Sequence, residues 1–191
     1  VNAAQERADN AKDRAEAARD RAKDALAHAK DARKRYVKAK ENFQEARKDY
    51  QEGRGKFQTA RDDVKKCKKD DGEVCTEYRK EMRREAPKFL LKAADTVLHT
   101  LERVKAKIDE SEMSDEKKAD FIADLDARIS AIEDAAATIE GMDENTPKED
   151  VQEAANTIRE EWTKSRNLLR RATNHMVNAK LGNIVHQAEK L

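Results

Sequence analysis

Residues 18–50 read ARDRAKDALAHAKDARKRYVKAKENFQEARKDY, and their spacing of alanine and aromatic residues is the main evidence for the fold. An alanine or an aromatic residue returns after alternating steps of four and three residues, from Ala18 to Tyr50. The same register extends outward to Ala4 and to Cys67, which makes nine heptads. A repeat of 3.5 residues sustained over this length is typical of a coiled-coil helix. The pattern therefore predicts one long helix over about the first 66 residues.

The two halves of this repeat carry different side chains. The first half has alanine at both the a and d positions, whereas the second half alternates aromatic residues with alanine. Alanine lets two helices approach closely but buries little apolar area, at about 0.8 kcal/mol per CH₂ group. Gly53 lies at a d position, where we expect a close helix contact rather than a kink. The predicted seam of helix packing comprises Ala8, Ala11, Ala15, Ala18, Ala22, Ala25, Tyr36, Phe43, Tyr50 and Phe57.

The composition of the whole chain agrees with long helices. Charged residues make up 42% of the 191 residues and aromatic residues 4%, and there are only five Gly and two Pro. The 41 basic residues offset the 40 acidic ones, so neither a disordered polyelectrolyte nor a strongly basic nucleic-acid binder is indicated. No run of 18 apolar residues is present, so we expect no membrane-spanning segment. Because the chain begins at Val1, we expect a processed or shortened form from which any signal peptide has gone.

The two cysteines, Cys67 and Cys75, predict a link between the first helix and the next. On one continuous helix they would lie about 12 Å apart, whereas a disulfide needs Cα atoms within about 7 Å. Asp70-Asp71-Gly72 between them is a turn signal, and a turn would bring the cysteines together across a helical hairpin. We expect a disulfide and an oxidising compartment, with two unpaired buried thiols as the alternative.

Three further helices are predicted over about residues 74–110, 115–140 and 147–190. Ser114 precedes an acidic first turn, and Thr146, Pro147 and Glu149 form a candidate capping box. Pro87 lies inside the first of these helices, where we expect a kink or a short break. The residues predicted to form the bundle core are Leu101, Ile122, Leu125, Ile129, Ile132, Ile158 and Trp162.

These elements predict an all-α fold, an elongated antiparallel helical bundle. Residues 1–72 form the long alanine-rich helix and its turn, and residues 73–191 form a three-helix bundle onto which that helix folds. Counting the rise of each helix, we expect the end of the last helix to lie beside Ala11 to Ala29. A second apolar face on that end, Val177, Leu181, Ile184 and Ala188, has no obvious local partner. Another copy of the chain, or residues after Leu191, could cover this face and the alanine seam of the first helix.

Part of the chain resembles a known group of proteins. The runs Phe89–Asp95, Ser114–Lys117 and Ile158–Trp162 resemble uncharacterised secreted or cell-surface helical proteins of archaea, over about residues 86–191. The first helix resembles the Ala- and charge-rich coiled coils that precede the bundle in such proteins. The resemblance implies a helical fold and an extracytoplasmic location, and it brings no assigned activity.

No constellation of residues predicts catalysis. Phosphate-binding glycine loops, Cys-x-x-Cys, His-Glu-x-x-His and nucleophile elbows are absent from the sequence. The carboxylate pairs Glu160-Glu161 and Asp143-Glu144 are expected to be solvated surface, and His175 and His186 to be interfacial or exposed rather than a metal or pH-sensing pair. The aromatic row and Trp162 are expected in the core rather than as stacking platforms, and the basic run of residues 65–69 at a solvated hairpin tip.

The sequence thus favours a non-enzymatic structural or assembly protein of the cell surface that self-associates through coiled-coil packing of its first helix. The partner would be protein, most simply another copy in an oligomer or filament. No nucleic acid, small-molecule substrate, metal or cofactor is implied. The alternative is an extracytoplasmic adaptor that presents its bundle to another protein, and an enzyme that its motifs do not reveal is a third hypothesis.

Overall fold

The computed structural model describes residues 2–67 and 72–188, and this part of the chain forms four helices and no strand. Helix α1 spans Asn2–Lys66, α2 Glu73–Asp109, α3 Asp115–Glu140 and α4 Lys148–Ala188. The predicted all-α class is confirmed. The bounds of α2, α3 and α4 lie within two residues of the predicted ones.

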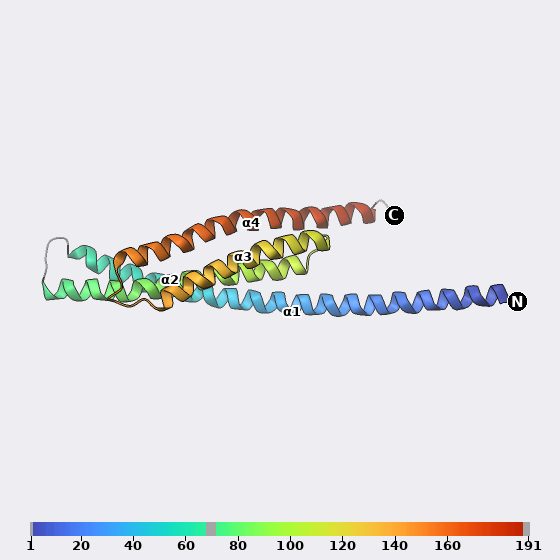
Figure 1. Ribbon diagram of the computed structural model, residues 1–191, viewed down its shortest axis with the longest axis horizontal. Helices are drawn as coiled ribbons and strands as arrows, with labels where there is room; N and C mark the ends of the chain where they lie inside the picture. Colours follow the sequence, from blue (N-terminus) through green and yellow to red (C-terminus); the bar gives the residue numbers. More distant parts are fainter. Residues whose placement is uncertain (1, 68–71, 189–191) are drawn as a thin grey trace.

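Helix α2 is the centre of the arrangement. It packs against α1, α3 and α4, and α3 and α4 also pack against each other. Between α1 and α3 or α4, no close backbone contact exists in the described chain. The second half of α1 therefore lies along α2, while its first part extends past every other helix (Figure 1).

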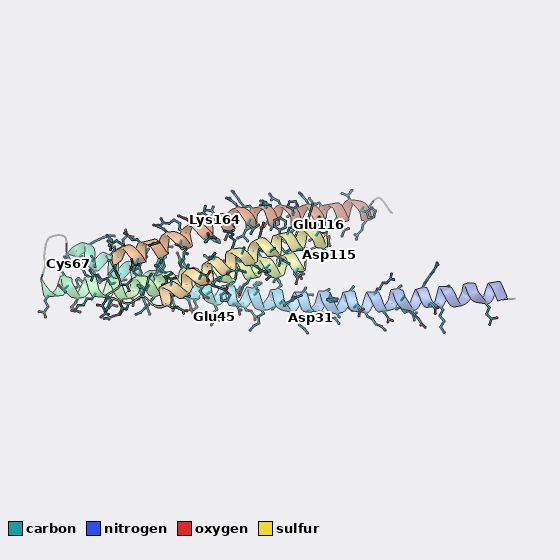
Figure 2. The ribbon with its side chains drawn as sticks, in the orientation of Figure 1. Asp31, Glu45, Cys67, Asp115, Glu116 and Lys164 are labelled. Atoms are coloured by element: carbon teal, nitrogen blue, oxygen red, sulfur yellow. A yellow bond between two sulfur atoms is a disulfide. The ribbon has the colours of Figure 1, made fainter. Side chains whose placement is uncertain are left out.

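The chain reversal between α1 and α2 carries a disulfide. Cys67 and Cys75 are bonded with their Cα atoms 5.7 Å apart, and both side chains are buried. Figure 2 places Cys67 at the end of the molecule away from both termini, which we call the disulfide end. The pairing predicted from the turn signal is thus present. Of that signal, Asp70 and Asp71 lie outside the described residues, and Gly72 precedes α2 with extended backbone.

The heptad pattern of α1 decides which side chains face α2. Alanines at d positions are buried from Ala32 onward, and the aromatic residues at a positions are half-buried beside them. At Gly53 the contact is tight, because a Cβ added there would lie 2.7 Å from Cδ of Lys92. The expected close contact at Gly53 is therefore observed, with the stem of Lys92 crossing the position.

The core of α2, α3 and α4 is rotated slightly from the predicted one. Leu101, Leu125, Ile132 and Ile158 are buried, whereas Ile122, Ile129 and Trp162 are half-buried at its edge. The residues buried in this region instead include Phe121 and Ala135 of α3 and Ala154, Glu161 and Leu168 of α4. Because α3 and α4 each pack against two helices, their most buried line runs between the two contacts rather than along one heptad seam.

Of the kink or short break expected at Pro87, the break is absent: helix α2 is continuous through this buried residue, although its ring removes the N–H that would have bonded the carbonyl of Arg83. The predicted cap of α4 was wrong. Thr146 does not cap α4: its hydroxyl accepts the backbone N–H of Asp143 at 2.9 Å. The carboxylate of Asp143 in turn accepts the backbone N–H groups of Asn145 and Thr146, so the turn before α4 is organised by Asp143.

The expectation that the end of α4 lies beside Ala11 to Ala29 was also wrong. Helix α4 packs on α2 and α3, and no close contact joins it to α1 in the described chain. Its end is held instead at the α2–α3 connection, where Asn183 Nδ2 donates to Glu112 Oε2 at 3.1 Å.

The rotated core predicts a ranking of substitutions. Ile132→Ala, at a fully buried position, should lower the free energy of unfolding by about 2–5 kcal/mol, as other large-to-small core changes do. Ile129→Ala, one turn away at the edge of the core, should lower it by less, and exposed Lys117→Ala should stay within about 0.5 kcal/mol. Urea unfolding followed by circular dichroism measures all three, and a larger loss at Ile129 than at Ile132 would contradict the observed core.

The disulfide predicts a second stability difference. Opening it releases a closed loop of nine residues, which the chain-entropy model values at about 2.5 kcal/mol. Reduced and alkylated protein should therefore unfold at lower urea concentration than the oxidised form. Intact mass before and after reduction reports the bond itself. Alkylation of two thiols in the native, unreduced protein would show that the bond is absent.

Candidate interaction surfaces

The first part of α1 is a helix without a neighbour. Every residue from 11 to 31 is exposed, and we call this segment the α1 arm. Of the predicted seam, Ala11, Ala15, Ala18, Ala22 and Ala25 are all exposed on it, and the side chain of Ala8 lies outside the described residues. Leu26 also stands 57% exposed. Helices in proteins obtain most of their stability from packing one face, and the arm has no such packing within the described chain.

Charges are sorted around the arm. Heptad positions e and g, which flank the alanine seam, are basic except at Leu26 and His28. These basic flanking residues are Lys12, Arg14, Arg19, Arg21, Arg33 and Arg35. Acidic residues such as Asp13 and Asp20 lie at f, on the opposite face. Sequence reasoning followed only the apolar positions and missed this sorting, although the letters at e and g carry it.

One of these basic residues forms an ion pair at the end of α2, where the packed part of α1 begins. Arg35 Nη2 lies 2.8 Å from Asp109 Oδ2 at the end of α2. A basic flank of α1 is therefore paired with an acidic residue of the helix packed against it. The same chemistry applied along the arm favours a partner helix with acidic flanks and opposes a second copy of the arm.

The end of α4 presents a row of large apolar side chains. Val177, Leu181, Ile184 and Val185 are between 51% and 57% exposed, and their spacing places them on one helix face. Met176 and Ala179, on the other face, pack against the core. The second apolar face predicted from the sequence is thus exposed in the described part, while the side chains of Ala188 and Leu191 lie outside it.

The aromatic residues of α1 are partly covered by α2. The Phe57 ring stacks on Phe89 with centroids 5.1 Å apart, and the guanidinium of Arg103 lies 4.0 Å from the Phe43 ring centroid. Lys107 lies over Tyr36 in the same way, at 4.8 Å. Cations of α2 therefore occupy ring faces that a bound base or ligand would need.

A buried carboxylate corrects one sequence expectation. Glu161, expected as solvated surface, is only 7% exposed on α4. Its carboxylate accepts Nη1 of Arg128 from α3 at 2.8 Å and Nζ of Lys164 at 2.5 Å. The hydrogen bond from Lys164 is the largest cause that lowers the pKa of Glu161, burial opposes it, and the bond from Arg128 adds to the lowering. The pair joins α3 to α4 and fixes their relative register.

The other titratable residues noted in the sequence have structural surroundings. Glu144 accepts both Nε and Nη2 of Arg84, at 3.1 and 3.0 Å, which holds the α3–α4 connection on α2. His175 lies against Phe121 with ring centroids 5.4 Å apart, and His186 is exposed. Residues 2–67 and 72–188 contain no group of three or more His, Cys, Asp or Glu placed to hold a metal ion. Within the same residues, no helix is both long and apolar enough to cross a membrane.

The Glu161 pair predicts a pH-dependent loss of stability. Because its pKa is lowered by folding, Glu161 contributes stability that is present above its unfolded pKa and lost as the pH falls through the folded value. Glu161→Gln should therefore cost about 1–2 kcal/mol at pH 7, since Arg128 and Lys164 lose a charged acceptor. The gap from the unaltered protein should narrow below about pH 4, near the unperturbed pKa of Glu. Urea unfolding at pH 7 and pH 3 measures it, and an undiminished gap at pH 3 would contradict the charged pair.

Comparison with known proteins leaves these surfaces as the guide to function. No protein-family model, curated protein or solved structure matched the chain.

Proposed function

We propose that this protein is a non-enzymatic structural or assembly protein whose exposed helix faces pair with other helices as coiled coils. The observation that carries the proposal is that the α1 arm has no packing partner among the described residues. The row on α4 adds a second unpaired face at the same end of the molecule. Apolar faces of this length on a water-soluble helix usually mark an interaction site.

Self-association supports this role best when it pairs unlike faces. Two α1 arms brought together would place basic flanks opposite basic flanks, which opposes pairing. The α4 row is flanked by Asn178, Lys180 and Gln187, of which one is charged. Its Leu and Ile side chains also offer the bulk that the alanine seam of the arm lacks. We therefore favour packing of the arm of one copy on the α4 row of the next.

Such a contact joins two different surfaces of the same chain. A heterologous contact closes into a ring only when its rotation fits, and otherwise it continues as a filament. The proposed assembly is therefore a ring or filament of copies joined arm to row. The resemblance to secreted or cell-surface archaeal proteins and the disulfide support an extracytoplasmic location for it.

The second candidate is an extracytoplasmic adaptor for another protein. The basic flanks of the arm favour it, because an acidic-flanked helix of a different chain would complement them better than any face of a second copy. In this role the arm captures the partner and the bundle of α2, α3 and α4 presents it.

The assembly role predicts a mass that depends on concentration. Light scattering coupled to size exclusion should show at least a doubling of mass between micromolar and high-micromolar protein, and electron microscopy should show rings or filaments. Leu181→Lys/Ile184→Lys should abolish the increase, because it places two cations on the row that meets the basic-flanked arm. Lys117→Ala is the matched surface control. A full-length chain that stays monomeric while fully helical would leave the adaptor as the function.

Cross-linking identifies which faces meet. Ala18→Cys and Leu181→Cys chains, mixed in equal amounts and treated with a short bismaleimide, should give mainly the mixed dimer. Dimers of two Ala18→Cys chains should be rare, because arm-to-arm pairing brings the basic flanks together. A dominant arm-to-arm product would overturn the unlike-face geometry.

A further inference from the structure

A groove at the disulfide end is separate from the assembly surfaces. Helices α1 and α4 both lie on α2 there without close backbone contact with each other, and the space between them is a groove of about 610 Å³. Its apolar lining comes from all three helices: Phe57 and Val64 of α1, Met82, Ala86, Phe89 and Leu90 of α2, and Val151 and Ala155 of α4.

These lining residues include large apolar side chains, which proteins usually bury. Phe57, Phe89 and Leu90 are only half-buried, although the first two stack on each other at the groove floor. On α4, Val151 and Ala155 are also only half-buried and line the groove. The groove therefore offers continuous apolar surface contributed by three helices.

The polar lining of this groove has one sign of charge. Arg79, Arg83, Lys148 and Arg159 line it, and none of the fourteen lining residues that the structure describes is Asp or Glu. In a chain with 41 basic and 40 acidic residues, such separation is a local departure from balance. Arg84, the neighbour of Arg83 along α2, is paired with Glu81 and Glu144. Arg83 and Lys148 form no ion pair with any described residue.

We propose that this groove binds a long-chain carboxylate, with the alkyl chain on the apolar lining and the carboxylate at the cations. Charge complementarity selects an anionic head, because the charged lining residues that the structure describes are all basic. The volume falls within the range of about 300–1,000 Å³ that small-molecule pockets occupy. A helix with its side chains is about 10–12 Å across, so a single bound chain fits this space better than a bound helix. The site is independent of the arm and of the α4 row.

Fluorescence titration of the full chain tests the site. The probe is 11-(dansylamino)undecanoate at micromolar concentration, which should bind one site saturably with enhanced, blue-shifted emission. Dodecanoate should displace it at least tenfold more effectively than 1-dodecanol, because only the acid meets the cations. Absence of saturable binding, or equal displacement by acid and alcohol, would overturn the proposal. Saturable binding of an acidic helical peptide with none of dodecanoate would overturn it as well.

Variants locate the bound molecule. Arg83→Glu/Lys148→Glu should weaken the affinity for dodecanoate at least tenfold and leave the affinity for 1-dodecanol unchanged, each calculated from displacement with the variant's own affinity for the anionic probe. Arg47→Glu/Lys117→Glu makes the same change in net charge at exposed positions outside the groove and should leave both unchanged. Ala155→Phe should block probe binding by filling the groove, with helicity checked by circular dichroism. Equal weakening in both double variants, or full probe binding to a folded Ala155→Phe chain, would place the ligand elsewhere.

Discussion

The whole arrangement depends on the packing of small residues of α1 against α2. The buried d positions of α1 are alanine or glycine, so the two helices approach closely and the stem of Lys92 passes over Gly53. The disulfide between Cys67 and Cys75 holds α1 and α2 in register at one end, and the Arg35–Asp109 ion pair joins them at the other. Between these two points α2 contacts every other helix. Removing α2 from this position would leave α1, α3 and α4 without a common partner.

A difference in length then determines what remains exposed. Helix α1 has 65 residues and α2 has 37, so α1 continues for 28 residues after its partner ends. At 1.5 Å per residue, this excess is about 42 Å of helix. The sequence keeps its heptad repeat throughout the excess and places basic residues beside it. An overhang that served only as a tail would not need either feature, which is why the arm is central to the proposed role.

Charge in this protein is arranged finely although its sum is near zero. Cations flank the seam of the arm, cations line the groove at the disulfide end, and a buried carboxylate between Arg128 and Lys164 ties α3 to α4. A buried ion pair adds modest net stability, because desolvation of the charges offsets their attraction. Loss of the Glu161 pair would still leave Arg128 and Lys164 without a charged acceptor. The pair therefore disfavours any other register of α3 against α4. Net charge alone would have hidden all three features.

The helices and their order could be predicted from the sequence. Helices α2 to α4 were predicted within two residues, and the Cys67–Cys75 pairing followed from the turn signal, because periodicity and turn residues act over a few neighbouring positions. The apolar row of α4 was also legible for this reason. The basic flanks of the arm could also have been predicted, because they follow from the residues at heptad positions e and g.

Which face of each helix packs against which neighbour depends on the tertiary structure. One-residue shifts buried Phe121 in place of Ile122 and Glu161 in place of Trp162, because a helix packed against two others turns the line between them inward. In the same packing, α4 makes no close backbone contact with α1 among the described residues. A groove therefore remains between them at the disulfide end, and no described helix covers the arm. Helical periodicity identifies an apolar face, but the angle at which that face meets its neighbours depends on all the contacts together.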